Sequence, residues 1–257
     1  MGSAAGLGKV DYPLIEECPW AVMRPRGRLS DETDQMGFFT TENFKQAFAL
    51  YIERLAPALF VTSYVTIGAV LIGLSLGLVL ALARLSSSVT LSRTTQIIIS
   101  VLRTIPVPPF LYLVYFSIIS TFFPIEPALA GTLALGILLT PYMAEVYRAG
   151  IQNVKQGQIE AARALGMPET LVRRRVILPL AIRLMLPAIG AQVVVTLLNS
   201  AFVAVMGGKD ITGMSRNIIY AWFTSELYFV VALTYFIISY PLSRGLAWLE
   251  RRLTLNL

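Results

Sequence analysis

Long apolar runs alternate with shorter polar and basic segments along most of this chain. Five of these runs, at about residues 56–83, 94–123, 128–143, 184–206 and 227–241, hold few charges. A helix needs about 20 apolar residues to cross the hydrocarbon core of a membrane. The pattern therefore predicts an all-α integral membrane protein with five transmembrane helices.

The second run is the least regular of the five. Arg103 interrupts it, and Pro106, Pro108 and Pro109 follow closely. Proline has no backbone N–H to donate and disrupts an α-helix. We therefore expect a kink or an unwound stretch inside this span.

The segment before the first run divides into two parts. Residues 1–40 hold several prolines, glycines and charges, and we expect an irregular extracytoplasmic extension or a disordered tail. Around residues 41–54 apolar side chains recur at helical spacing, which predicts an amphipathic helix at the outer membrane surface. These side chains are Phe44, Phe48, Tyr51, Ile52 and Leu55. No basic start and apolar core of a signal peptide precede them, so the first span is expected to direct insertion.

Lys and Arg collect in alternate loops, which indicates the orientation of the chain. Between the third and fourth runs they are Arg148, Lys155, Arg163, Arg173, Arg174, Arg175 and Arg183. Between the first and second runs, and after the fifth, they are Arg84, Arg93, Arg244, Arg251 and Arg252. The loop between the second and third runs has neither residue type. With five spans, this places the N-terminus outside and the C-terminus in the cytoplasm.

Composition supports the membrane prediction and limits the chemistry. Only 14% of the 257 residues are charged, against about a quarter in soluble domains. The formal net charge of +6 does not indicate nucleic-acid binding, because the basic residues lie between apolar runs. Cys18 is the single cysteine and histidine is absent, which excludes an internal disulfide and disfavours a zinc or histidine-based catalytic site.

The basic segment between the third and fourth runs predicts two short helices joined by a turn. Residues 156–165 are rich in Ala, Glu and Gln, which are compatible with helix. Gly166 suits a left-handed cap at the end of this helix, and Pro168 suits the first turn of the next. The second helix is expected to end just before Pro179. Such an element on the cytoplasmic face is suited to docking a soluble partner.

This segment also resembles the EAA motif of ATP-binding-cassette (ABC) importer permeases. The matching residues are Glu160-Ala161-Ala162, Gly166, Val176 and Leu178-Pro179. In that family the short helix fits a groove on the ATPase subunit and transmits its closure to the membrane. The resemblance implies a coupling segment at about residues 152–178, with ATPase contacts from Glu160, Ala161, Ala162, Leu165, Gly166 and Met167. Glu160 has the alternative role of an ion-pair partner for the cytoplasmic arginines.

Further stretches narrow the resemblance to the polar amino acid permeases. They are Tyr142-Met-Ala-Glu-Val-Tyr-Arg-Ala-Gly-Ile151, Gly157-Gln158, Tyr240-Pro-Leu-Ser-Arg244 and Trp248-Leu-Glu-Arg-Arg-Leu253. The resemblance covers residues 41–257 and implies one permease domain in the bacterial cytoplasmic (inner) membrane. This domain would pair with a second permease around a central pathway and would receive its cargo from an extracytoplasmic solute-binding protein.

The resemblance also implies that this chain is not an enzyme and binds no cofactor. A separate cytoplasmic ABC ATPase, expected as a dimer, would use ATP and Mg. In agreement, the sequence holds no G-x-x-x-x-G-K-[ST] phosphate-binding loop.

Three departures from the family pattern lie near the expected substrate pathway. Arg103-Thr-Ile-Pro106 replaces the usual Arg-Gly-Thr-Pro, and Phe110 matches a family glutamine. Asn199-Ser-Ala-Phe202 stands in place of Lys-Asp-Thr-Ser-Leu, without its charges. Polar side chains within spans usually face partners or substrate, so we expect a weaker or rebuilt substrate site in this subunit. Either a heterodimer in which the partner permease supplies most substrate contacts, or a cargo other than a typical charged amino acid, would explain the loss.

Candidates for the substrate pathway are Arg103, Thr140, Tyr142, Gln192, Asn199 and Ser200. Arg103 either faces the pathway or extends its charge toward the cytoplasm. Gln192 and Asn199 share a helix face and either line the pathway or form interhelical hydrogen bonds. Thr140 and Tyr142 flank a proline, where a kink would expose backbone carbonyls.

Two other pairs of residues have simpler interpretations. Glu145 and Arg148 are one helical turn apart and predict a local ion pair. Gly73 and Gly77 predict close helix packing, either within the subunit or with a partner.

Three functions are compatible with these patterns. The first is a permease subunit of an ATP-driven importer for polar amino acids. The second is an ABC permease for another small solute, such as methionine or an amino acid derivative. The third is an ion-coupled secondary transporter, which typically has an internal repeat or paired broken helices.

Overall fold

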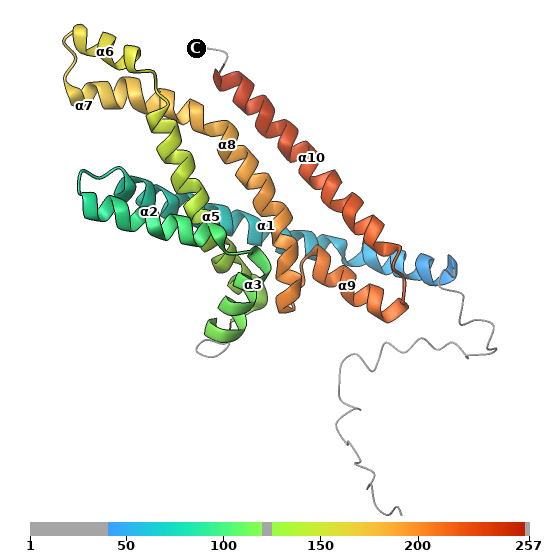
Figure 1. Ribbon diagram of the computed structural model, residues 1–257. Helices are drawn as coiled ribbons and strands as arrows, with labels where there is room; N and C mark the ends of the chain where they lie inside the picture. The colour runs from blue at the N-terminus through green and yellow to red at the C-terminus, as the bar shows by residue number, and fades with distance from the viewer. Residues whose placement is uncertain (1–40, 120–124, 255–257) are drawn as a thin grey trace, which may run out of the picture.

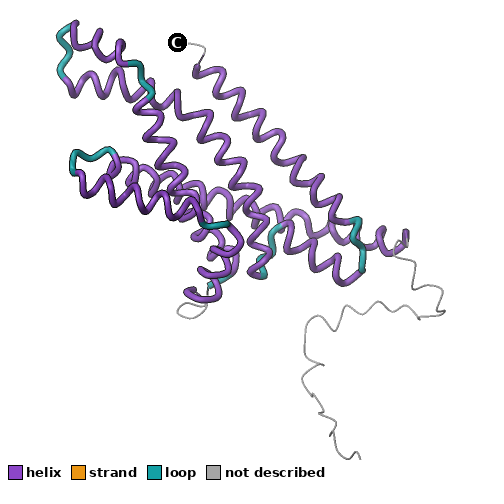
Figure 2. Tube along the Cα trace, in the orientation of Figure 1, coloured by secondary structure: helices purple, strands orange, loops and turns teal. Residues whose placement is uncertain are grey.

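A computed structural model describes residues 41–119 and 125–254 of the chain. All regular structure within these ranges is helical, as the sequence predicts (Figures 1 and 2). The extension expected over residues 1–40 lies outside the described residues, as does the end of the second apolar run.

The helices are listed here in chain order. They are α1 (Thr41–Arg84), α2 (Val89–Thr104), α3 (Val107–Tyr112), the π-helix η3 (Leu113–Ile119), α5 (Pro127–Gln152), α6 (Gln156–Ala164), α7 (Glu169–Val172), the π-helix η4 (Arg173–Ile177), α8 (Leu178–Asn199), the 3₁₀-helix η5 (Ser200–Met206), α9 (Ile211–Trp222) and α10 (Leu227–Thr254). Four of them, with adjoining segments, are long and apolar enough to cross a membrane. The bent pair formed by α2 and α3–η3 makes a fifth span if it is counted as one, in agreement with the prediction.

The first helix joins two elements that the sequence pattern separated. α1 runs for 44 residues without a break, through Pro57, from the amphipathic segment into the first span. At 1.5 Å per residue its length is about 66 Å, roughly twice the thickness of the hydrocarbon core. α1 therefore extends well beyond the membrane.

The second span breaks where its prolines predict. α2 ends at Thr104, and the axes of the two helical pieces on either side of the break differ by 103°. Pro106 occupies the N-cap position of α3, and prolines also fill its first turn, where a missing N–H leaves no helical bond unmade.

The cytoplasmic segment folds into the expected helical hairpin, but its second helix does not end before Pro179. Helical structure continues from α7 through η4 and α8 to Asn199. In the π-turn before this proline, the Leu178 N–H donates to the Arg173 carbonyl. The prediction of a helix end was wrong. The π-turn is wider than an α-turn, and Pro179 lies in the first turn of the helix that follows it, α8. A proline is tolerated there because its missing N–H leaves no helical hydrogen bond unmade.

At the opposite end of the bundle lies α9, a helix that the sequence pattern did not predict. Gly207, with a φ of +85°, ends η5, and Asp210 caps the start of α9 through its side chain. α10 then returns along α8 and continues through Pro241 to Thr254, well beyond the predicted end of the fifth span. Figure 1 shows the end of α10 and the α6–α7 hairpin at the same end of the bundle.

The interior is organised around the contact between α1 and α5. Glycines on one helix receive side chains of the other: Gly68 lies against Thr132, Gly73 against Leu139, Gly77 against Met143 and Gly136 against Ile72. The small residues predicted to give close packing thus act within the subunit. This close contact fixes α5, which carries one wall of the site described next.

Candidate functional site

A small cavity lies between the α2–α3 break, α5 and α8, with a volume of about 150 Å³. It is lined by Ile105, Val107, Leu135, Leu138, Leu139, Tyr142, Gln192, Val195, Thr196 and Asn199. Most of these side chains are apolar, and the others supply a phenol, two amides and a hydroxyl. Such a wall suits a small molecule that is held by a few hydrogen bonds.

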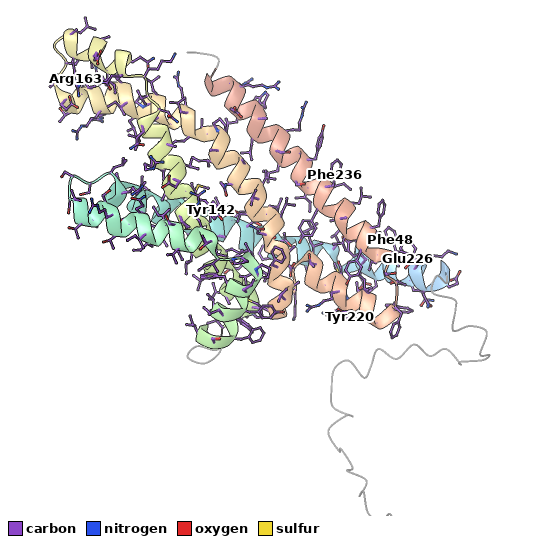
Figure 3. The ribbon with its side chains drawn as sticks, viewed as in Figure 1. Phe48, Tyr142, Arg163, Tyr220, Glu226 and Phe236 are labelled. Carbon is purple, nitrogen blue, oxygen red and sulfur yellow. The ribbon has the colours of Figure 1, made fainter. Side chains whose placement is uncertain are left out.

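The structure places three of the predicted pathway residues in this wall and a fourth beside it. Tyr142, Gln192 and Asn199 line the cavity. The guanidinium carbon of Arg103 lies 5.2 Å from the centroid of the Tyr142 ring, in a cation–π contact. The Tyr142 hydroxyl donates to the backbone carbonyl of Arg103 at 3.4 Å. Figure 3 labels Tyr142 near the place where α2 and α5 cross in the view.

The other two candidates lie outside the cavity lining. Thr140 is buried, and its hydroxyl donates to the Gly136 carbonyl one turn earlier in α5. Ser200 is also buried, and its hydroxyl donates to the Leu197 carbonyl. Both hydroxyls satisfy backbone carbonyls of their own helical segment, as Ser and Thr commonly do in helices.

Thr196 is a cavity residue that sequence reasoning missed. Its hydroxyl donates to the Gln192 carbonyl at 2.8 Å, and its side chain lies one turn from that of Gln192. The spacing i, i+4, i+7 from Gln192 to Asn199 includes it, so helical periodicity provided the signal. Among the described residues, no group of three or more His, Cys, Asp or Glu side chains is arranged to hold a metal ion.

The turn of the α6–α7 hairpin has the geometry predicted for Gly166. Its φ is +76°, in the left-handed region that favours glycine. The Met167 N–H donates to the Ala162 carbonyl at 3.2 Å and the Gly166 N–H to the Arg163 carbonyl at 2.9 Å. This pair of bonds is a Schellman motif, which ends α6 and sets the direction of α7.

An ion pair across the turn holds the two arms of the hairpin together. Arg163 on α6 donates to both carboxylate oxygens of Glu169 on α7, at 3.1 and 3.0 Å, and Figure 3 labels this arginine near the tip. Arg173 approaches the same carboxylate at 3.7 Å. The pair is exposed and contributes little to stability, but its two-point geometry restricts the angle between the arms.

The motif residues differ in what they present to solvent. Glu160, Ala161 and Gly166 are exposed, and Leu165 is 83% exposed, while Ala162 is buried and Met167 is half-buried. Leu165, at the tip of the hairpin, is therefore available for an apolar contact with a partner. No ion pair of Glu160 is found within the described residues.

Where α5 meets the end of α1, a small charge network forms. Glu145 accepts from Arg148 at 2.7 Å, which confirms the predicted local pair, and it lies 3.8 Å from Arg84. Arg148 also donates to Gln152. Two arginines therefore share one carboxylate, and the network keeps a positive charge.

Asp210 is a buried carboxylate at the other end of the molecule, between the spans, that sequence reasoning did not single out. One of its oxygens accepts from the Thr212 N–H at 3.1 Å, while the neighbouring Ile211 N–H donates to the Thr62 hydroxyl on α1. Burial raises the pKa of Asp210 from 3.8 to about 7 against the opposing effect of its backbone hydrogen bonds and, to a smaller extent, of Arg216.

Comparison with known proteins places these features in a family context. Residues 73–255 match the model of the family described as "Binding-protein-dependent transport system inner membrane component". The chain is 32% identical over 184 residues to the glutamine transport system permease protein of Escherichia coli, covering 70% of this chain and 84% of that protein. It is 31% identical over 204 residues to the nopaline transport system permease protein of Agrobacterium fabrum, covering 74% of this chain and 84% of that protein.

A solved structure extends the similarity to the fold. It is described as an amino acid ABC transporter with histidines, and it matches with a TM-score of 0.74 and 35% identity. The match covers 83% of this chain and 99% of that chain.

Proposed function

We propose, since this chain belongs to the family of binding-protein-dependent transport system inner membrane components, that it is the transmembrane permease subunit of an ATP-driven importer for polar amino acids. It is a multi-pass membrane protein and a transport subunit. Relatives named for glutamine and nopaline, and the solved amino acid ABC transporter, support the cargo class. Family membership favours this function over an ion-coupled carrier.

The observation that carries the proposal is the pairing of a cavity inside the bundle with a docking hairpin at its end. The cavity wall is formed by α5 and α8, and the hairpin is the segment that connects these two helices. A partner that moves the hairpin therefore acts on both walls. The exposed Leu165 at its tip provides an apolar contact for that partner.

The partner is a separate cytoplasmic ABC ATPase, which hydrolyses ATP with Mg. Its dimer closes on ATP, moves the hairpin through Glu160, Ala161, Ala162, Leu165, Gly166 and Met167, and thereby opens the pathway alternately to the two sides. This chain supplies half of the pathway. A second permease, different in sequence, supplies the other half and most of the substrate contacts, because Asn199 and its neighbours replace a charged stretch of the family pattern.

Residues 41–257 constitute the permease domain, and residues 1–40 an extracytoplasmic extension. The permease resides in the bacterial inner membrane with its N-terminus outside and its C-terminus in the cytoplasm. An extracytoplasmic solute-binding protein delivers the cargo. The outer end of α1 extends beyond the membrane at that face and is available for docking.

Purification of the chain from its native membranes in mild detergent tests the proposal. We expect an ABC ATPase and a second permease to purify with it, and proteoliposomes that hold the complex and its binding protein to take up a polar amino acid only with ATP. Leu165→Asp should remove most of the ATPase, while Thr170→Asp, an exposed control on the other arm, should retain it. Purification without any ATPase, or uptake without ATP, would contradict the proposal.

A further inference from the structure

We infer that a pocket between α1 and α9 binds the headgroup of an anionic phospholipid, at the end of the bundle opposite the hairpin. The inference goes beyond the proposed function and does not depend on which cargo is carried. The pocket has a volume of about 270 Å³. Figure 1 shows α9 beside the N-terminal part of α1, and the two helices are in contact.

The polar groups that line this pocket have two positive charges and no negative charge. Arg54 on α1 and Lys209, just before α9, are exposed, and neither forms an ion pair with another described residue. Asn217 on α9 adds an amide. Guanidinium and ammonium groups are the common partners of phosphate oxygens in proteins. The pocket is therefore suited to an anion that contains a phosphate.

These two cations lie where membrane topology does not call for them. Most Lys and Arg side chains lie toward the hairpin end, in the segments predicted to be cytoplasmic. Lys45, nearer the start of α1, is already paired with Glu42 at 3.0 Å. Glu53 is next to Arg54 in sequence, but adjacent residues of a helix point about 100° apart, and Glu53 does not line the pocket. The charges of the pocket are thus left for a ligand.

The length of α1 places the pocket at the level of the lipid headgroups. With Arg84 at one membrane surface, Arg54 lies about 30 residues along the helix, or about 45 Å away, and about 34 Å away across the membrane at a tilt of about 40°. The hydrocarbon core is about 30 Å thick, and the bilayer with its headgroups is about 40–45 Å thick. Tyr220, which is exposed on α9 and labelled in Figure 3, agrees with this level because tyrosine is enriched at membrane interfaces.

An exposed apolar stripe on α1 begins beside the pocket and provides a surface for acyl chains. Phe60, Tyr64, Ile67 and Leu71 recur at spacings of three and four residues, so they share one face of the helix. Phe60 follows Pro57, which lines the pocket, by three residues, so the stripe adjoins the pocket. A phospholipid would occupy both surfaces at once, whereas a free phosphate ion would use only the pocket.

The same features favour an anionic lipid over two other occupants. The ammonium or choline group of a zwitterionic lipid would lie close to two cations, with no acidic side chain in the pocket lining to offset them. An acidic side chain of a docked soluble protein would pair with Arg54 and Lys209, but such a protein would not reach the apolar stripe inside the membrane.

Photocrosslinking of lipid to the purified complex tests this inference. The permease, with the ATPase and partner permease that purify with it, is placed in phosphatidylcholine nanodiscs. These contain a small fraction of phosphatidylglycerol with a photoreactive group close to the headgroup, and mass spectrometry identifies the labelled peptides. We expect peptides of α1 around residues 54–71 and of α9 to be labelled at least about fivefold more strongly than by a matched phosphatidylcholine probe. Excess inorganic phosphate should not reduce the labelling.

Substitution of the two cations identifies the binding groups. Arg54→Gln combined with Lys209→Gln should lower the labelling of α1 and α9 at least about fivefold and leave labelling at the cytoplasmic end of α10 unchanged. Arg54→Lys combined with Lys209→Arg, which keeps both charges, should retain most of it. Lys45→Gln, which removes a paired cation outside the pocket, should have no effect. An unchanged melting temperature in detergent shows that each variant is folded.

Three results would overturn the inference while leaving the proposed function intact. Equal labelling by the two lipid probes would mean that the site does not select an anionic lipid, and displacement by inorganic phosphate would mean that it holds a small anion. Unchanged labelling of the double glutamine variant would exclude the pocket as the lipid site, and weaker binding of the solute-binding protein to that variant would then identify a docked protein as the occupant. Because labelling is measured on this chain, a preparation without any ATPase would contradict the proposed function and still decide the lipid site.

Discussion

At the scale of single residues, the glycines between α1 and α5 are under a tight steric constraint. A Cβ added at Gly77 would lie 2.5 Å from the Met143 Cβ and 3.0 Å from the Thr140 carbonyl oxygen. The first neighbour is the side-chain atom bonded to the backbone and the second is a backbone atom, so both have little freedom to move. Gly245 in α10, in contrast, has nothing within 4 Å of the same position.

We therefore expect Gly77→Ala to destabilise the protein and Gly245→Ala not to do so. Overpacking at Gly77 should cost about 1–3 kcal/mol, seen as a lower melting temperature in detergent. Gly245→Ala should be neutral or stabilising by up to about 1 kcal/mol, because alanine favours helix. Equal melting temperatures for the two variants would mean that α1 and α5 pack less closely than described.

Asp210 predicts a dependence of stability on pH. Its pKa is about 7 in the folded protein and 3.8 when solvated, so between these values the folded state binds more protons than the unfolded state. Stability should then fall as the pH rises from about 4 to about 7 and change little above that range.

Asp210→Asn separates this effect from the capping of α9, because asparagine caps helices as well as aspartate does. The melting temperature of Asp210→Asn should not decrease between pH 5 and pH 7. At pH 8 it should be higher than that of the unmodified protein. Asp210→Ala, which removes the cap, should be less stable than Asp210→Asn by about 1 kcal/mol. A parallel pH dependence in all three proteins would show that other groups are responsible.

At the scale of elements, the α6–α7 hairpin depends on one backbone conformation. Gly166 holds a φ of +76°, which costs other residues roughly 1 kcal/mol or more. Gly166→Ala should change the angle between the arms and weaken retention of the ATPase during purification. Gly157→Ala, in the helical part of α6 with open space around it, should retain the ATPase and serve as the matched control. Equal retention by both variants would mean that the turn geometry is not needed for docking.

Prediction from sequence succeeded where one local rule determined the element. The apolar runs predicted the spans, and Pro106 and its neighbours predicted the break in the second span. Gly166 predicted the turn of the hairpin. It failed where a proline was accommodated by its surroundings. Pro179 follows a π-turn, and Pro241 lies inside α10, so neither ends a helix.

The cavity was predicted only in part, because it depends on contacts between distant segments. Helical spacing placed Gln192 and Asn199 on one face. The stacking of Arg103 on Tyr142 joins residues 39 positions apart on two different helices, and no local pattern specifies such a contact. Burial of Thr140 and Ser200 likewise depends on the packing of neighbouring helices.

At the scale of the whole molecule, the orientation in the membrane is open to a direct test. Cys18→Ser removes the single native cysteine. In that background, Gln158→Cys in α6 should react with a membrane-impermeant maleimide only after cells are permeabilised. Lys209→Cys, at the opposite end of the bundle, should react in intact cells with the outer membrane opened. The reverse pattern would place the hairpin outside, where no ATPase is available to it.

We expect the long first helix to link the two faces of the membrane mechanically. α1 is packed along α5, and α5 leads directly into the hairpin, so a displacement of the hairpin passes to the end of α1 on the far side. Events at the two surfaces would then act on one pair of helices, and no separate relay would be needed. If nucleotide bound at the inner face changes the affinity of a protein for the outer face, the coupling is reciprocal. That protein, when docked outside, should change the affinity for nucleotide by the same factor.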